Sequence, residues 1–302
     1  MTRLESSPSI LPLYLKAAMP LIPGASSLPF LPGGGGEIPS GLGFELKGVV
    51  PQQDQVAEYA KVCGFPLKDR LPPTFPHVLA FPLHMAVMSN GEFPFGAVGL
   101  VHIENSINQL RPIAFGEMLE VKVGVTSLSP HPKGQIFSLL TEVSAAGETV
   151  WTETSTMLRR GKGSKKPSAP GLEIPTLDPG TPASATWKLP ADLGRRYGAV
   201  SGDRNPIHMH ALTAKPLGFH SAIAHGMWTA ARALAQIESR LPDSFTAGVR
   251  FRKPIFLPAR VQFAAEGDGT ETLFAVRDAR KGTPHMDGRI TSNANETAKA
   301  SN

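Results

Sequence analysis

The chain is poor in cysteine, in charge and in long hydrophobic runs. Cys63 is the single cysteine in 302 residues, which excludes an internal disulfide, so we expect a reducing, cytoplasmic location. The apolar stretch ILPLYLKAAMPLIPG is interrupted by Lys16 and by prolines, and it falls short of the roughly 20 residues that a membrane span requires. We therefore expect no membrane span, and residues 1–39 are interpreted as an apolar arm rather than a secretion signal.

Charged residues make up 18% of the chain, and the formal net charge is +5. The one basic cluster, RRGKGSKK at residues 159–166, has no aromatic platform or zinc-finger spacing beside it, so we expect no nucleic-acid partner. Residues 161–185 are rich in Gly, Pro, Ser and Lys and lack periodicity, which predicts a linker. The length of the chain predicts two units of about 100 to 150 residues.

The two halves of the chain resemble each other. RPIAFGEMLEVKV from Arg111 and RKPIFLPARVQFA from Arg252 share an arginine, a Pro-Ile step and alternating apolar positions. In the second half, apolar residues at helical spacing from Ile223 to Leu241 predict a long helix, and alternation downstream predicts strands. The fold class is therefore α+β, with a long helix wrapped by an antiparallel sheet in each copy. We place the copies at residues 40–160 and 186–292, followed by a disordered tail at 293–302.

The stretch SGDRNPIHMH, residues 201–210, gathers acidic and imidazole side chains in a short loop. Pro206 restricts the backbone, so Asp203 and His208 can point into one cavity. Gly202 stands where a left-handed helix cap is often needed, and Asn205 can hold the loop through bonds from its side chain to the backbone. A carboxylate and an imidazole that face one water can activate it and exchange its proton.

YGAVSGDRNPIH at residues 197–208, followed by AIAHGMW at 222–228, resembles the MaoC-type (R)-specific hydratases and dehydratases, which have the hotdog fold. The likeness extends over residues 186–292 and more weakly over the first half, which implies a double hotdog. The resemblance implies that Asp203 and His208 are the catalytic pair, that Asn205 holds the loop, and that the Gly226 N–H binds the thioester carbonyl. The unpaired N–H groups of a helix start suit that last role.

The first half lacks these groups. Aligning EYAKVCGF with RYGAVSGD places Phe65 where Asp203 stands, and aligning VLAFPLHM with AIAHGMWT places Pro82 where Gly226 stands. A degenerate N-terminal unit and one active site per chain are therefore expected. In related double-hotdog dehydratases the inactive half opens space for the acyl tail, and Phe65 and Phe81 are candidates to line it.

Further residues near the motif are weaker candidates for substrate contacts. Arg250, Arg252 and Lys253 can contact the phosphates of coenzyme A or an acidic acyl carrier protein, although a solvated strand edge is an equal alternative. His225 is a candidate substrate contact, or it packs beside the helix start. No His-x-x-x-His spacing occurs among the histidines, so we expect no metal. This expectation concerns four histidines around the motif: His208, His210, His220 and His225.

The expected activity is the (R)-specific hydration of an enoyl thioester, or dehydration of an (R)-3-hydroxyacyl thioester, by a hydro-lyase. The carrier is coenzyme A or acyl carrier protein, with no further cofactor. A hotdog acyl-CoA thioesterase and a non-catalytic acyl-CoA-binding protein are the alternatives, and the intact Asp-Asn-Pro-His set speaks against both. The chain is expected to be a monomeric pseudo-dimer or a homodimer.

Overall fold

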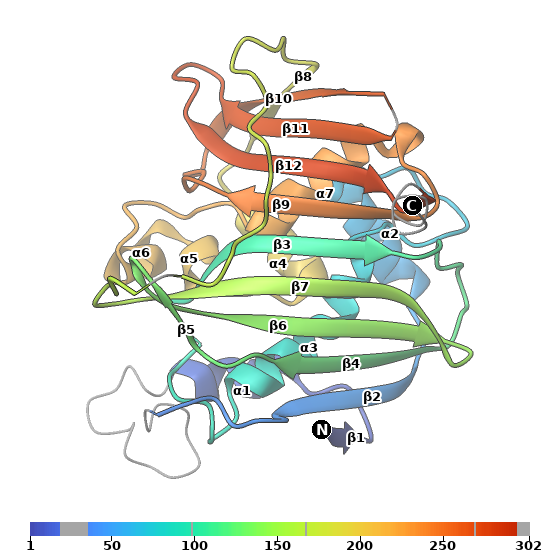
Figure 1. Ribbon diagram of the computed structural model, residues 1–302, viewed down its shortest axis with the longest axis vertical. Helices are drawn as coiled ribbons and strands as arrows, with labels where there is room; N and C mark the ends of the chain where they lie inside the picture. The colour runs from blue at the N-terminus through green and yellow to red at the C-terminus, as the bar shows by residue number, and fades with distance from the viewer. Residues whose placement is uncertain (19–35, 98, 167, 269, 295–302) are drawn as a thin grey trace. The chain divides into compact units, whose positions relative to one another are not determined.

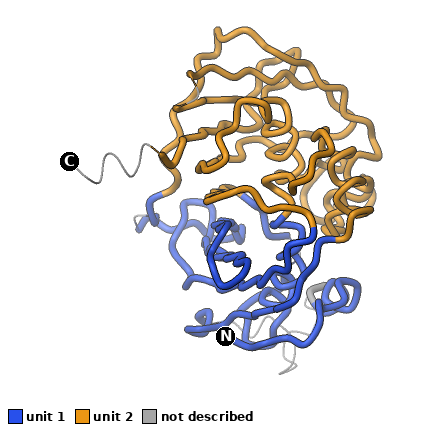
Figure 2. The backbone as a smooth tube through the Cα atoms, turned by 90° about the vertical axis from the view of Figure 1, so that its right-hand side faces the viewer, with its two compact units in different colours: residues 1–51, 76–102, 116–170 blue, residues 52–75, 103–115, 171–302 orange. Residues whose placement is uncertain are grey.

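The computed structural model describes residues 1–18, 36–97, 99–166, 168–268 and 270–294. They form two compact units that are interleaved along the chain, as the two colours of Figure 2 show. Unit 1 consists of Met1–Pro51, Pro76–His102 and Gly116–Pro170, and unit 2 consists of Gln52–Phe75, Ile103–Phe115 and Gly171–Asn302. Two segments that precede the predicted linker, Gln52–Phe75 and Ile103–Phe115, thus belong to the second unit.

Unit 1 combines a helix with a mainly antiparallel sheet. The elements are β1 (Thr2–Leu4), α1 (Ile10–Ala18), β2 (Gly43–Val49), α3 (Phe75–Met88, in this unit from Pro76), β4 (Leu119–Val125), β5 (Ser129–His131), β6 (Gly134–Ala145) and β7 (Glu148–Arg160). The strand order is β1-β2-β4-β6-β7, with β5 on β6, and only β1 and β2 are parallel. The helix α3 lies on this sheet (Figure 1), since His84 of α3 bonds to Thr141 of β6.

Unit 2 has the same plan. The elements are α2 (Gln53–Cys63), β3 (Val101–Gln109, in this unit from Ile103), β8 (Ala185–Leu189), α4 (Leu193–Ser201), α5 (Pro206–Met209), α6 (Ala211–Ala214), α7 (Gly226–Gln236), β9 (Phe245–Phe251), β10 (Ala259–Gly267), β11 (Glu271–Asp278) and β12 (Pro284–Ser292). The strand order is β3-β9-β12-β11-β10-β8, antiparallel throughout. The predicted architecture, a helix on an antiparallel sheet in each of two units, is confirmed.

The alternation that predicts strands in the second half corresponds to one buried face. Val249 of β9 is 3% exposed, and Val261 and Phe263 of β10 are fully buried. Trp187 of β8 stacks on Phe263 with ring centroids 5.4 Å apart, which extends the apolar face to the edge strand. Burial of such side chains supplies most of the favourable free energy of folding. The sheet of unit 2 therefore holds α7 on a continuous apolar surface.

The long helix of the second half is shorter than predicted. Periodicity indicates a helix from Ile223 to Leu241, but α7 ends at Gln236, and a 3-10 turn follows at Glu238–Arg240. Ile223 is extended: its N–H donates to the Ile207 carbonyl at 3.0 Å, and it forms a β-bridge with Phe256. Ile223 follows the apolar period because its side chain is buried in the core, although its backbone is not helical. The prediction was wrong at both ends.

The segments predicted as arm, linker and tail make specific contacts. Thr2–Leu4 pairs in parallel with β2, and residues 161–184 contain no helix or strand in their described part. Within unit 2, Leu177 packs on Ala264 and Ala275, so this part of the linker covers the sheet. Asn293 donates to the Asn108 Oδ1 at 2.8 Å. Residues 19–35 of the arm and 295–302 of the tail lie outside the described residues.

None of the helices in the described ranges is both long enough and apolar enough to span a bilayer.

Candidate active site

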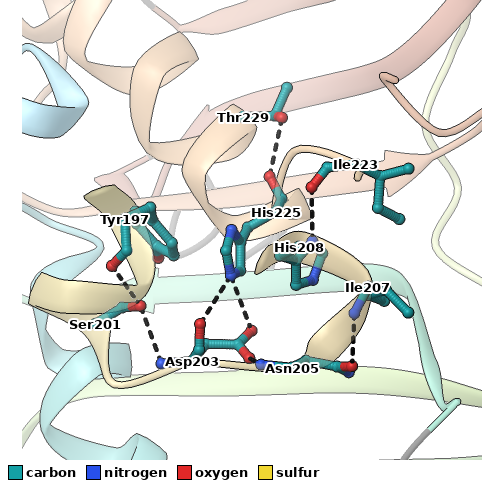
Figure 3. Close-up of polar contacts among 9 residues, drawn as sticks. All are labelled: Tyr197, Ser201, Asp203, Asn205, Ile207, His208, Ile223, His225 and Thr229. Atoms are coloured by element: carbon teal, nitrogen blue, oxygen red, sulfur yellow. Dashed lines mark hydrogen bonds and ion pairs between the residues drawn. The ribbon is translucent and has the colours of Figure 1, made fainter. Parts of the chain in front are cut away.

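The candidate site begins at the turn that ends α4. Gly202 has a φ of 79°, and its N–H donates to the Gly198 carbonyl at 3.1 Å. This is the left-handed cap that the sequence predicts, a conformation that costs glycine little. Ser201 strengthens the turn, because its hydroxyl donates to the Tyr197 carbonyl at 2.8 Å and accepts the Asp203 N–H at 3.2 Å (Figure 3). Asp203 is thereby fixed at the exit of the helix.

Two glycines on α4 allow the loop after the turn to lie directly on the helix. A Cβ atom at Gly194 would lie 2.0 Å from the His208 carbonyl oxygen, and one at Gly198 would lie 2.7 Å from the Asp203 carbonyl oxygen. Any side chain at these positions would displace the loop together with both candidate catalytic residues. The sequence analysis missed this pair. The available signal was the four-residue spacing of Gly194, Gly198 and Gly202, which places them on one helix face.

The one-turn helix α5 (Pro206–Met209) carries His208. The Asn205 side-chain oxygen caps this helix by accepting the N–H two residues further on at 3.4 Å. Pro206 occupies the first helical position, where a missing N–H costs nothing. The Asn205 N–H also donates to Asp203 Oδ1 at 3.1 Å. Asn205 therefore holds the loop as predicted, and it ties the carboxylate to the start of the helix that carries the imidazole.

The imidazole of His208 is buried, and its hydrogen bonding fixes the tautomer. Nδ1 lies 2.8 Å from the Ile223 carbonyl oxygen, and since a carbonyl only accepts, Nδ1 carries the hydrogen. Nε2 of the neutral ring is then the basic nitrogen. Burial lowers the pKa of His208 below its ordinary 6.5, although the charge of Asp203 and the bond to Ile223 act in the opposite direction. His208 is therefore neutral at pH 7 and can accept a proton at Nε2.

A second imidazole, that of His225, lies against His208. The rings stack with centroids 3.6 Å apart at an interplanar angle of 24°. Nε2 of His225 donates to the Asp203 backbone carbonyl at 3.0 Å and lies 3.7 Å from the carboxylate oxygen Oδ2 (Figure 3). Burial and the neighbouring His208 lower the pKa of His225 to about 3. His225, a candidate substrate contact from the sequence, is thus bonded to the loop; whether it also touches substrate stays a prediction.

The three side chains converge. One nitrogen or oxygen atom each of Asp203, His208 and His225 lies within 4.8 Å of the others. The Asp203 side chain is 26% exposed and that of His225 only 2%, so solvent reaches the group from the carboxylate. A carboxylate and a basic imidazole at this separation can bind and activate one water. The same donors suit a metal ion, so the expectation of a metal-free site stays a prediction.

The helix α7 begins at Gly226, directly after His225. The N–H groups of a first helical turn have no acceptor within the helix and carry a partial positive charge. A Cβ atom at Gly226 would lie 3.0–3.1 Å from ring atoms of Phe251, so glycine keeps this position compact. An oxyanion can be bound here, next in the chain to the ring that stacks on His208. The role of the Gly226 N–H as that donor stays a prediction.

Two of the three basic candidates near β9 are engaged within unit 2. Arg250 Nε donates to Glu104 Oε1 of β3 at 3.1 Å, and Arg252 Nε donates to Asp287 Oδ2 of β12 at 2.6 Å. Lys253 is exposed. An ion pair partly neutralises the charge of an arginine and occupies one of its N–H donors, which weakens its attraction for an added phosphate. Phosphate binding by these residues stays a prediction, and Lys253 is the best placed of them.

The first half of the chain has a similar turn without the catalytic groups. Gly64 ends α2 with a φ of 82°, and the residue that follows is the buried Phe65 of unit 2. Phe81, also buried, lies in unit 1, and the predicted acyl-lining role of both phenylalanines is untested. The alignment of Pro82 with Gly226 is wrong in structural terms, because Pro82 lies inside α3 and not at its first turn. The alignment assumed that Pro82 marks a helix start, whereas α3 contains this proline in its interior.

Comparison with known proteins gives consistent matches. The family model described as MaoC like domain matches residues 176–288. 3-Hydroxyacyl-thioester dehydratase X of Mycobacterium tuberculosis is 42% identical over 238 residues, which are 78% of this chain and 84% of that protein. The crystal structure of HtdX from the same organism superposes with a TM-score of 0.74 at 34% identity, covering 83% of this chain and 99% of the other.

A MaoC-like dehydratase from Phytophthora capsici has a TM-score of 0.65 at 21% identity, covering 83% of this chain and 94% of that one. This likeness supports the fold alone, whereas the M. tuberculosis relative covers most of both chains at high identity. The fold is a double hotdog, in agreement with the two helix-on-sheet units. The chain belongs to the MaoC-like dehydratase family, and it is a hydro-lyase.

Proposed function

We propose that this hydro-lyase interconverts a 2-enoyl thioester and an (R)-3-hydroxyacyl thioester, with Asp203 and His208 as the acid-base pair. The observation that carries the proposal is the convergence of these two side chains beside the start of α7, with the basic Nε2 of His208 left available. The similarity to a protein named 3-hydroxyacyl-thioester dehydratase supports the substrate class. Coenzyme A or an acyl carrier protein serves as the carrier, and the residues of the site need no further cofactor.

In the hydration direction, a water lies between Asp203 and His208. His208 Nε2 takes a proton from the water while the water oxygen bonds to the β-carbon. Asp203 orients the water, and its negative charge balances the positive charge of the imidazolium. The π electrons move onto the thioester oxygen, and the Gly226 N–H stabilises this enolate. The acid-base pair then returns a proton to the α-carbon as the enolate collapses. Water has added across the double bond, and the pair regains its first protonation state.

The (R) configuration follows from the resemblance of the motif to (R)-specific enzymes and needs its own test. Hydration of crotonyl-CoA, hydrolysis of the product and chiral chromatography of the 3-hydroxybutyrate measure it directly. We expect the (R) acid. Recovery of the (S) acid would leave the pair in place as a catalyst and would overturn the proposed orientation of the substrate.

The roles of Asp203 and His208 are tested by Asp203→Asn and His208→Gln in a crotonyl-CoA hydration assay. We expect each substitution to lower kcat/KM by about 10² to 10⁴, the usual contribution of general acid-base catalysis. His210→Gln is the matched control, because His210 is an exposed imidazole on the same loop. Near-full activity in both variants contradicts the assignment.

Two further measurements, thiol release from saturated acyl-CoA and binding of acyl-CoA, separate the rival activities. A thioesterase releases free thiol from saturated acyl-CoA, and a binding protein retains acyl-CoA without turnover. We expect neither result.

Substitution of Lys253 by Gln is expected to raise KM for crotonyl-CoA without changing kcat, because a carrier phosphate remote from the reacting bond contributes uniform binding. An unchanged KM would remove Lys253 from the proposed site.

The proposed location is the cytoplasm. The support is the single cysteine, Cys63, because disulfides are typical of proteins in oxidising compartments and one cysteine cannot form a disulfide within the chain. Fractionation of the native host, followed by detection of the chain with an antibody, tests this location.

A further inference from the structure

A second cluster of titratable side chains lies in unit 1, whereas the groups of the proposed reaction lie in unit 2. His77 and His84 project from α3, and Glu153 projects from β7. The two histidines are seven residues apart, close to two helical turns, so they share one face of α3. That face lies on the sheet, because His84 Nε2 is 2.8 Å from the Thr141 hydroxyl of β6 and His77 bonds to Glu153 of β7.

The carboxylate of Glu153 is unusual for its burial. Its side chain is 0% exposed, and His77 Nδ1 lies 2.9 Å from both of its oxygens. Charged carboxylates are seldom fully buried unless they are paired or bind a metal. A purely structural bond from helix to sheet needs no ionisable groups, since a hydroxyl and an amide suffice. The cluster instead contains two imidazoles and a carboxylate, which are common metal ligands.

The geometry of the cluster fits a small cation. One nitrogen or oxygen atom each of His77, His84 and Glu153 lies within 4.8 Å of the others, and all three residues are buried. Donors bonded to one tetrahedral ion at about 2.0–2.2 Å lie roughly 3.4 Å apart, so a contraction of at most about 1.4 Å would form such a site.

We propose that unit 1 binds one divalent transition-metal ion of the Zn²⁺ class through His77, His84 and Glu153. Two imidazole nitrogens and one carboxylate oxygen are a common zinc donor set, and three protein ligands leave the fourth position to water. The ion replaces the hydrogen between His77 and Glu153 and joins α3 to β7. Its function is structural, because it links a helix and a strand of the same unit.

The triad of Asp203, His208 and His225 is the competing location, since its donor atoms also lie within 4.8 Å of one another. The burial of the carboxylate favours unit 1. Asp203 is 26% exposed, whereas Glu153 is 0% exposed, and a buried carboxylate gains more from a cation than a solvated one.

The test uses the full chain without a polyhistidine tag. The protein is stripped with a chelator, incubated with excess Zn²⁺ or Co²⁺, desalted and analysed by elemental mass spectrometry. We expect one equivalent of metal per chain, and for Co²⁺ the intense visible absorption of a four-coordinate site. Retention of less than about a tenth of an equivalent after desalting would overturn the proposal without the need for any variant.

Variants locate the ion. His84→Asn leaves the His77–Glu153 pair intact and should lower the retained metal at least tenfold. His208→Asn, which changes the competing triad, and His131→Asn, a histidine of unit 1 outside the cluster, should each keep one equivalent. Circular dichroism and a thermal melt of the stripped proteins check that His84→Asn folds. Loss of metal in His208→Asn with retention in His84→Asn would overturn the proposal, and so would retention in both.

Discussion

The helices α2 and α4 lie in the same unit and end in the same way. Tyr59 and Tyr197, which align in the two halves, are both fully buried with ring centroids 6.1 Å apart. Gly64 and Gly202 then cap the helices with φ angles of 82° and 79°. The turn after α2 is followed by Phe65, and the turn after α4 is followed by Asp203. The left-handed turn is therefore a structural device that does not by itself make a site.

The helix surface before the turn differs as well. α2 has Val56 and Ala60 at the positions of Gly194 and Gly198, so its surface cannot accept a loop at the close approach seen on α4. Five residues after Phe65 stands Arg70, which pairs with Asp243 at 2.9 Å. The comparison indicates that the site requires both the acid-base residues and a helix face whose glycines let the loop pack closely against it.

The largest expected effect comes from making the second turn like the first. Asp203→Phe removes the carboxylate while it keeps a residue type that a left-handed glycine turn accepts. We expect kcat/KM for crotonyl-CoA to fall by about 10³ or more, within the range of general acid-base catalysis. Far-ultraviolet circular dichroism checks that the variant is folded. Residual activity within tenfold of the wild type would refute the catalytic role of the carboxylate.

The reverse substitution, Phe65→Asp, should bring no activity. No imidazole stands five residues further on, and Phe65 is 7% exposed, so a buried carboxylate replaces a packed ring. We expect the free energy of unfolding to fall by about 3 kcal/mol. Combined with Asp203→Asn, Phe65→Asp should restore nothing. Any rescue of hydration in that double variant would show that the turn alone suffices.

The helix surface is tested by Gly194→Ala, whose new Cβ would lie 2.0 Å from the His208 carbonyl oxygen. We expect kcat/KM to fall by about 100-fold, because a displacement on the order of 1 Å at a catalytic group has an effect of that size. Gly161→Ala is the control, since nothing lies within 4 Å of its Cβ position. Wild-type kinetics in Gly194→Ala would show that close packing of the loop is unnecessary.

A smaller loss is expected from His225→Asn. The substitution removes the ring that stacks on His208 and weakens the hydrogen bond to the Asp203 carbonyl. One such bond is worth about 1 kcal/mol, so we expect kcat to fall about fivefold with KM nearly unchanged. His131→Asn, which also alters a side-chain bond to the backbone, should leave kcat as it is. A change confined to KM would favour the earlier interpretation of His225 as a substrate contact.

The smallest effect is a shift in titration. Burial lowers the pKa of His208 and the charge of Asp203 partly raises it again, so the pKa measured by NMR should lie below 6.5 and fall further in Asp203→Asn. The hydration rate should decline as pH falls through this pKa, because a protonated Nε2 accepts no proton. A pKa above 6.5 in the wild type, or a rise on removal of the carboxylate, contradicts this electrostatic account.

Much of the fold could be predicted because most strands bury one apolar face. Val249, Val261 and Phe263 follow the period of two that a half-buried strand requires. The strand β3 escaped detection because it buries Asn105 and Gln109 on that face beside Ile107, so a search for apolar alternation does not find it. Its pairing with β9 also could not be predicted, since register across a long separation depends on tertiary packing.

The site was predicted where a single residue type has a local conformational preference. Gly202 and Asn205 act on the backbone within a few residues, which sequence alone can indicate. The roles of Gly194 and His225 depend on contacts between segments. A glycine in a helical sequence does not indicate which segment packs against it. The cluster around Glu153 was missed for the same reason, because its members are far apart in the chain and meet only on the sheet.

The most direct test of the acid-base pair is a double-mutant cycle on kcat/KM for crotonyl-CoA hydration, with Asp203→Asn, His208→Gln and the two combined. Groups that act as a unit on one water are strongly non-additive, so the double variant should be about as slow as the slower single variant. If the losses in the single variants instead multiply in the double variant, the two side chains act independently, and the pair described here does not exist.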